Sequence, residues 1–171
     1  MTGPAGWPAG APVRYLAGVN RLVVDSRPAR SPLAVLARAV FLLAALPALL
    51  RASARAARWE SRLTLERLAP RLRAVAPFRS RRLRERPEWL LASLDRLLPL
   101  LPPRRYGACL RRSLLLLDLW SRCGLEVRLH LGVRRSGESA HEAHAWVTAC
   151  QPDGSRRLAT ASLDYPEAFA L

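Results

Sequence analysis

The chain has no lysine and no isoleucine, and its acidic residues are few. All 28 basic residues are arginines, against 13 aspartates and glutamates, which gives a formal net charge of +15. The accompanying excess of alanine, leucine, proline and glycine is typical of a GC-rich coding sequence, so part of the basicity reflects base composition. We therefore do not infer a nucleic-acid partner from the charge alone.

Cysteine is scarce as well. The three cysteines cannot all pair, and their spacing does not resemble a disulfide framework, so Cys109 is expected to be a free thiol in a reducing compartment. The proline-rich N-terminus lacks the basic start and apolar run of a secretory signal. These absences together predict a bacterial cytoplasmic protein.

A long uncharged apolar run is also missing. Residues 33–50 are strongly apolar, but Arg38 lies among them and Pro47 interrupts them, so there is no span of ~20 uncharged residues. A membrane helix is the alternative interpretation. The pattern favours a buried amphipathic helix that begins at Ser31 and Pro32, and we predict no integral membrane span.

The chain of 171 residues, half of them hydrophobic, suits one catalytic domain with extensions. Residues 1–31 are predicted to be a flexible N-terminal extension, in which residues 15–24 could form a strand or docking segment. Residues 32–103 are predicted to be an arginine-rich helical region. Residues 104–171 are predicted to be the catalytic core.

Twelve arginines and three glutamates occur in residues 51–86, where Pro70 and Pro77 punctuate one or two short helices. Their charges are expected to form the solvated face of helices that pack by their leucines. The alternative is a docking surface for an acidic peptide or partner protein. A cleaner helix starts at Pro87, with leucines at helical spacing as far as Leu98.

The last third of the chain contains the residue types of thiol chemistry. Apolar residues at helical spacing follow Cys109 and end at Gly124, so the cysteine lies at a helix start. The helix dipole favours an anion there, and the thiolate is the nucleophilic form. Residues 127–133 then alternate like a half-buried strand, and a second strand begins near His144. We predict a helix packed on an antiparallel hairpin.

In that arrangement Cys109 and His144 meet where helix and sheet join. There the imidazole can take the thiol proton and later protonate a leaving amine. A small buried cysteine is one alternative. Zinc is another, because Cys109, Cys150, His141 and His144 offer four ligands, but the paired Cys-x2-Cys spacing of structural sites is missing. We predict no metal and no cofactor.

Other residues near this site have less specific patterns. Cys123 precedes the helix-ending glycine and Cys150 lies at a strand end, so both are expected to be packing residues. His130 alternates with apolar neighbours and is expected to be exposed. His141 is a candidate for a substrate contact or a supporting role. Trp146 is expected in the core, with a wall of the substrate cleft as the alternative.

Four motifs occur in one order along the last third of the chain: Cys109-Leu110-x-Arg112-Ser113-Leu114, Gly124, Leu131-Gly132-Val133 and His144-Ala145-Trp146-Val147. Together they resemble a known family, the transglutaminase-like leader peptidases of lasso peptide biosynthesis (the B proteins). The resemblance covers roughly the last 70 residues and implies an α+β fold, in which a helical region precedes a papain/transglutaminase-like core. Within the pattern, Arg112 and Ser113 are candidates for helix anchoring.

The resemblance implies that Cys109 is the nucleophile, that His144 is the base, and that an acid on the following strand orients the imidazole. Here the turn after the second strand is longer than in the family, and the next strand has no acid before Asp164, which is the expected third member. Asp153, Thr160 or a backbone carbonyl are the alternatives, and an impaired enzyme is a further one.

The implied function is a cysteine peptidase that removes the leader from a ribosomally synthesised lasso precursor before a separate cyclase closes the macrolactam. The chain resembles the stand-alone form without a fused leader-recognition domain. The implied partners are therefore the precursor peptide, a small leader-recognition protein and an asparagine-synthetase-like cyclase. The alternatives are another transglutaminase-like thiol acyltransferase, and a non-catalytic arginine-rich binding module whose affinity falls with salt.

Overall fold

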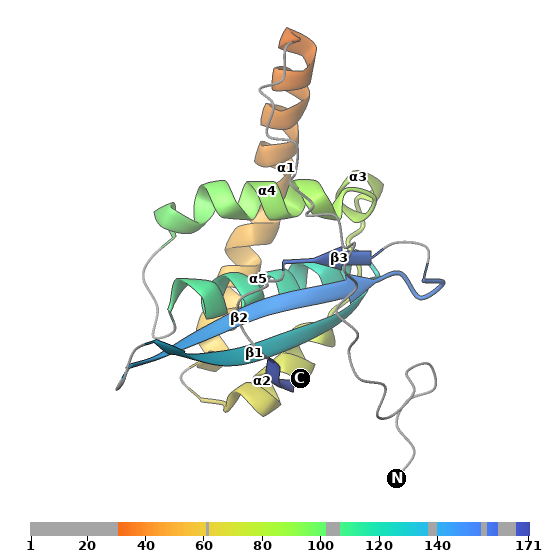
Figure 1. Ribbon diagram of the computed structural model, residues 1–171. Coiled ribbons are helices and arrows are strands. Elements are labelled where there is room, and N and C mark those ends of the chain that lie inside the picture. Colours follow the sequence, from red (N-terminus) through yellow and green to blue (C-terminus); the bar gives the residue numbers. More distant parts are fainter. Residues whose placement is uncertain (1–30, 61, 102–106, 137–139, 155–156, 161–166) are drawn as a thin grey trace.

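The computed structural model describes residues 31–60, 62–101, 107–136, 140–154, 157–160 and 167–171. Helices form the first part of the chain and antiparallel strands the last, so the predicted α+β class is confirmed (Figure 1). The elements are α1 (Pro32–Glu60), α2 (Leu65–Arg73), α3 (Arg81–Arg84), α4 (Pro87–Leu97), the 3-10 turn η1 (Leu98–Leu100), α5 (Ala108–Arg122), β1 (Glu126–Ser136), β2 (Ala140–Cys150), β3 (Arg157–Ala159) and β4 (Glu167–Ala170).

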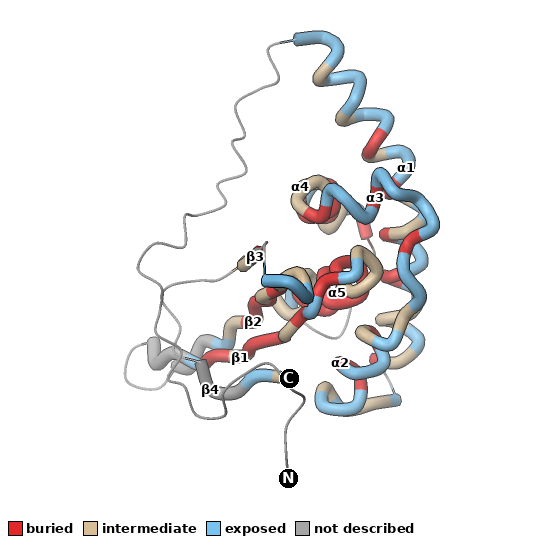
Figure 2. The backbone as a smooth tube through the Cα atoms, turned by 90° about the vertical axis from the view of Figure 1, so that its right-hand side faces the viewer, coloured by how far each residue is buried: buried red, intermediate tan, exposed pale blue. Residues whose placement is uncertain are grey.

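Helix α5 is the centre of the molecule. Its residues from Ser113 to Trp120 are all buried, as expected of a helix that is apolar on nearly every side. The sheet covers one side of α5, while α1, α2 and α4 cover the others (Figure 2). The helix ends as predicted, because Gly124 follows it with a φ of 82°, a left-handed conformation that favours glycine.

The sheet has the strand order β3-β2-β1-β4 and is antiparallel throughout. The predicted hairpin is confirmed: β1 and β2 pair over their whole length, with Leu129 opposite Val147 and Gly132 opposite His144. Alternate residues of both strands, among them Leu129, Ala145 and Val147, join the leucines of α5 in the main core. This alternation fixes which side chains of β2 face the helix and which face away.

The basic segment also follows the prediction in part. Two short arginine-rich helices, α2 and α3, form within residues 51–86, but residues 51–60 extend α1 instead of starting a new helix. Pro70 lies inside α2 near its end. The leucine-striped helix predicted from Pro87 is α4. The apolar segment at residues 15–24 lies outside the described residues, and the division of the chain at residues 31 and 103 stays a prediction.

The interpretation of residues 33–50 as a buried helix is wrong for its first half. The helix packs on the body through Phe41, Ala45, Leu49 and Ala52, but its first turns have no described element against them and project from the body (Figure 2). Pro47 is exposed and does not end the helix. Among the described residues, α1 alone is long and apolar enough to cross a membrane, with a mean hydropathy of 2.4 over an 18-residue window that is 17% buried.

Asp118 holds the middle of α5 against α1. Its carboxylate is 1% exposed and accepts hydrogen bonds from Arg55 of α1 (3.0 Å) and from Arg122 one turn later on α5 (3.3 Å). Burial raises the pKa of Asp118 above its usual range, although both arginines favour the charged form. The attraction between a buried carboxylate and two guanidinium groups depends strongly on their distances and orientation. The Asp118 contacts therefore restrict how α1 and α5 align.

Replacing Asp118 with Ala should lower the free energy of unfolding by about 2–4 kcal/mol, because two partly buried guanidinium groups lose their partner. Urea denaturation followed by circular dichroism measures this change. Glu85→Ala is the control, because Glu85 forms an exposed ion pair with Arg81 and should change stability little. Equal losses in the two variants would contradict the structural role of Asp118.

Candidate active site

Cys109 is the second residue of α5, and Gly107 is the N-cap of that helix. The cysteine side chain is half-buried, and its Sγ lies 4.0 Å from the backbone carbonyl oxygen of Ala143 on β2. Ala143 is the residue before His144. The thiol at the tip of the helix therefore lies beside the peptide bond that leads into the predicted base.

This contact lies along one edge of β2, where the backbone carbonyls of alternate residues point to the same side. The carbonyl of Val147 accepts a hydrogen bond from the N–H of Thr160, just after β3 (2.9 Å). The carbonyl of Ala145 accepts one from the hydroxyl of Ser113 on α5 (3.0 Å), and the carbonyl of Ala143 faces the thiol. Along this edge of β2, the backbone carbonyls therefore meet first the end of β3 and then side chains of α5.

Ser113 anchors the N-terminal part of α5 to this edge. Ser113 is fully buried, so water cannot replace this hydrogen bond between its hydroxyl and the carbonyl of Ala145. Ser113 follows Cys109 by four residues, which is about one turn, so both side chains lie on the side of the helix that meets β2. The anchoring contact consequently determines how close the thiol lies to the strand.

His144 lies on the other face of β2 from the main core. Ala145 is buried against α5, and strand alternation places His144 and Trp146 on the opposite face. There the ring of His144 stacks on Trp146, with centroids 6.3 Å apart, and Trp146 stacks on His130 at 5.5 Å. If the thiol lay under the middle of the sheet, on the side of the main core, the strands would separate it from His144 on the opposite face. Because Cys109 approaches along the edge of the strand, thiol and imidazole can meet across that edge.

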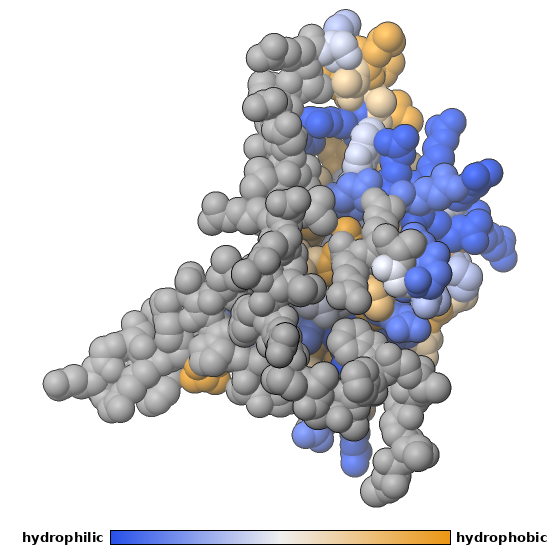
Figure 3. All heavy atoms as spheres, turned by 45° about the vertical axis from the view of Figure 1, so that its right-hand side comes forward, coloured by the Kyte–Doolittle hydropathy of each residue, from blue (hydrophilic) through white to orange (hydrophobic). Residues whose placement is uncertain are grey.

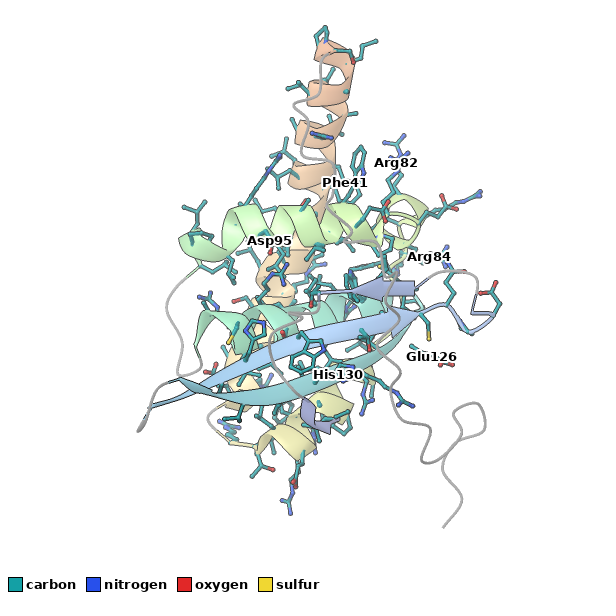
Figure 4. All side chains as sticks on the ribbon, viewed as in Figure 1. Phe41, Arg82, Arg84, Asp95, Glu126 and His130 are labelled. Carbon is teal, nitrogen blue, oxygen red and sulfur yellow. The ribbon has the colours of Figure 1, made fainter. Side chains whose placement is uncertain are left out.

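Arg112 joins the N-terminal part of α5 to α4 through an ion pair, and its charge affects the pKa of His144. Its guanidinium donates two hydrogen bonds, of 2.6 and 3.0 Å, to the carboxylate of Asp95, which lies on the side of α4 toward α5 (Figure 4). Burial lowers the pKa of His144 below its usual range, and the positive charge of Arg112 lowers it further. The imidazole is therefore neutral near pH 7 and able to accept a proton, as a general base must.

The candidates for orienting His144 differ in their positions. Asp153 lies in the turn beyond Cys150, the end of β2, which is itself roughly 20 Å along the strand from His144 at ~3.3 Å per residue. The hydroxyl of Thr160 is engaged with the backbone N–H and carbonyl of Val147, at 3.0 and 3.3 Å. Asp164 lies outside the described residues, and its role as the third member stays a prediction.

The other two cysteines have contacts of their own. The Sγ of Cys123 lies 3.5 Å from the carbonyl oxygen of Leu83, and the Sγ of Cys150 lies 3.9 Å from a carboxylate oxygen of Glu126. Both side chains are half-buried. Cys123 directly follows the last residue of α5, whereas Cys109 lies at its start, and Cys150 is the last residue of β2. Cys123 packs against the core, as expected from the sequence, whereas Cys150 is not among the described residues that pack against it.

The expected exposure of His130 is wrong. This residue is buried, its Nε2 lies 2.7 Å from the hydroxyl of Thr148, and its ring stacks on Trp146 (Figure 4). Trp146 is buried as expected, but between two histidine rings instead of in the main core. The alternation of the strand predicts which face these residues share, whereas it cannot tell whether that face is covered.

The described residues offer no group of three or more histidine, cysteine, aspartate or glutamate side chains that could hold a metal ion. Cys150 lies at the far end of β2 from His144, again roughly 20 Å away, so these two cannot bind one zinc ion with bonds of ~2 Å. The side chain of His141 lies outside the described residues.

A thiol at the tip of a buried helix, beside the strand that carries a histidine, is the arrangement of thiol hydrolases and acyltransferases. The family model described as "Transglutaminase-like superfamily" matches residues 29–154, which is more than half of the chain. The chain belongs to the transglutaminase-like superfamily, and its fold is of the cysteine protease and acyltransferase type. No curated protein and no solved structure gives a significant match.

Replacing Arg112 with Gln should raise the pKa of His144, because the nearby positive charge that disfavours the imidazolium is removed. A titration followed by NMR measures this pKa directly, since the chain has only three histidines to assign. Asp95→Asn is the matched control: it disrupts the same ion pair but keeps the charge of Arg112, so the pKa of His144 should not rise. A rise of similar size in both variants would show that the charge of Arg112 is not the cause.

Proposed function

We propose that the protein is a cysteine peptidase that removes the leader from a ribosomally synthesised lasso peptide precursor before a separate cyclase closes the macrolactam. The observation that carries this proposal is the position of the Cys109 Sγ, 4.0 Å from the carbonyl oxygen of the residue before His144. Membership of the transglutaminase-like superfamily supports the reaction class. The motifs around Cys109 and His144 support the finer assignment.

In this mechanism His144 takes the proton of Cys109, and the sulfur attacks the scissile carbonyl carbon. Backbone N–H groups at the tip of α5 stabilise the oxyanion, where one good donor is worth on the order of 10²-fold or more in rate. The imidazolium then protonates the leaving amine as the C–N bond breaks. Water, deprotonated by the same imidazole, hydrolyses the thioester, which releases the leader as an acid and restores the thiol.

The mechanism gives Arg112 and Ser113 supporting roles. Ser113 holds the helix tip at the edge of β2, and the charge of Arg112 adds to the effect of burial in lowering the pKa of His144. The third member remains open in the proposal: Asp164 is the acid that the family pattern favours. Its substitution by Asn should reduce turnover without changing substrate binding if it orients His144.

The proposal includes three partners: the precursor peptide, a small leader-recognition protein and an asparagine-synthetase-like cyclase. All are expected to act in the cytoplasm, where the precursor is made. Exposed arginines of α2, such as Arg67, lie on the opposite side of α5 from α4 and provide a basic surface on which an acidic segment of the precursor or partner can dock (Figure 1).

Incubating the precursor and the leader-recognition protein with the chain should release the leader, and mass spectrometry should find both fragments. Replacing Cys109 or His144 with Ala should each reduce the rate by at least ~10³-fold, because nucleophile and base act as one unit. Cys150→Ala is the matched control, since this cysteine is equally half-buried but lies at the far end of β2.

Three results would contradict the proposal. Cleavage that persists in the Cys109 variant would exclude a thiol mechanism. Transfer of the acyl group to an added amine in preference to water would instead favour an acyltransferase of the same superfamily. Binding of the precursor without cleavage, weakened steeply by salt and unchanged by Cys109→Ala, would favour an arginine-rich binding module.

A further inference from the structure

The free end of α1 is apolar on all sides. From Pro32 to Val40 each residue is exposed or half-buried, and Leu33, Val35 and Leu36 are 76%, 55% and 60% exposed. Only Arg38 is charged in this stretch. Figure 2 shows these turns extending beyond α4 and α3. Leucine, valine and alanine thus occupy most of the circumference of these turns, and Arg38 occupies the remainder.

This pattern indicates the kind of partner that surrounds the helix. A helix that docks on another protein is apolar along one stripe, whereas a helix that is apolar all round lies in a core or in lipid. Nine residues at 1.5 Å each span about 14 Å, which is roughly half of the ~30 Å hydrocarbon layer of a bilayer. The free end is thus too short to cross a membrane but long enough to lie in one leaflet at its surface, with the long side chain of Arg38 reaching the headgroups.

A positively charged surface lies beside the point where α1 leaves the body. We define the α3 arginine cluster as Arg79, Arg81, Arg82, Arg84 and Arg86, all of them exposed. Residues 79–88 contain these five arginines and two glutamates, so the segment is strongly basic. Figure 3 shows hydrophilic atoms gathered next to the hydrophobic end of α1, and Figure 4 shows Arg82 and Arg84 on the same side of the molecule as Phe41.

An aromatic contact joins the cluster to α1. The guanidinium of Arg86 lies over the ring of Trp89, 4.5 Å from its centroid, and Trp89 meets Phe41 of α1 edge to face at 5.2 Å. Half-buried tryptophan with neighbouring arginine is typical of the boundary between a membrane and water. The contact that attaches α1 to the body thus contains residue types found at such a boundary.

We propose that the free end of α1 and the α3 arginine cluster together bind the surface of a bilayer that contains anionic phospholipids. Leucine and valine side chains of α1 enter the region between headgroups and acyl chains, while the cluster contacts lipid phosphates. This surface is separate from the candidate active site, so the proposal does not depend on the proposed peptidase activity.

Flotation of the full chain with vesicles tests the proposal. The chain should float with vesicles of phosphatidylcholine and phosphatidylglycerol, much less with phosphatidylcholine alone, and salt should weaken the binding. Leu33→Glu together with Leu36→Glu should weaken binding to the mixed vesicles by at least ~tenfold. Arg82→Glu together with Arg84→Glu should do the same, since each basic residue near the surface adds to the attraction.

Control variants elsewhere on the chain test whether vesicle binding depends on this surface or only on the overall charge and hydrophobicity. Leu100→Glu changes a leucine that is 78% exposed on η1, at the other end of α4 from α3, and should leave binding intact. Arg62→Glu with Arg67→Glu makes the same charge change near and on α2 and should have a smaller effect than the change in the cluster. Far-UV circular dichroism checks that each variant keeps its helices.

Three outcomes would overturn the proposal: failure of the wild-type chain to float with the anionic vesicles, flotation of the leucine variant at the wild-type level, or equal losses in the cluster and α2 variants. Self-association of the wild type that the leucine substitutions abolish, without vesicle binding, would show instead that a second copy covers α1.

Discussion

The hydrogen bond from Ser113 to the carbonyl of Ala145 is the contact on which the candidate site depends. It joins the first turns of α5 to the edge of β2, in a fully buried place where losing one partner costs about 1–3 kcal/mol. Cys109 reaches the same edge one turn earlier. If this helix shifted along the strand, the thiol would lose its position beside the carbonyl of Ala143, while the core could still pack.

Ion pairs hold the same helix from two other sides. Asp118, buried in the middle of α5, binds Arg55 of α1, whereas Arg112 near the helix start binds Asp95 of α4. The buried pair restricts how α1 and α5 align, and the more exposed pair adds little stability but sets the charge beside His144. The helical region thus contributes to the electrostatics of the site as well as to the core.

Much of this arrangement could be predicted from the sequence, because it follows from local patterns. The leucines after Cys109, the glycine at residue 124 and the alternation of residues 127–133 predict a helix and a strand from their own spacing. The exposure of α1 could not be predicted, since an apolar run has the same composition in a core, in lipid or in solvent. Asp95 was missed for a similar reason: its partner is 17 positions away on another helix, and neither spacing nor a motif links the two.

We propose that the thiol of Cys109 and the imidazole of His144 are neighbours across the edge of β2, which is the central claim about the site. The rate of iodoacetamide alkylation at each cysteine, measured by mass spectrometry near pH 7, tests this claim most directly. We expect His144→Ala to slow the alkylation of Cys109 and to leave the rates at Cys123 and Cys150 unchanged, because the proposed proton acceptor of the first thiol is lost. An unchanged rate at Cys109, with the protein folded, would contradict it.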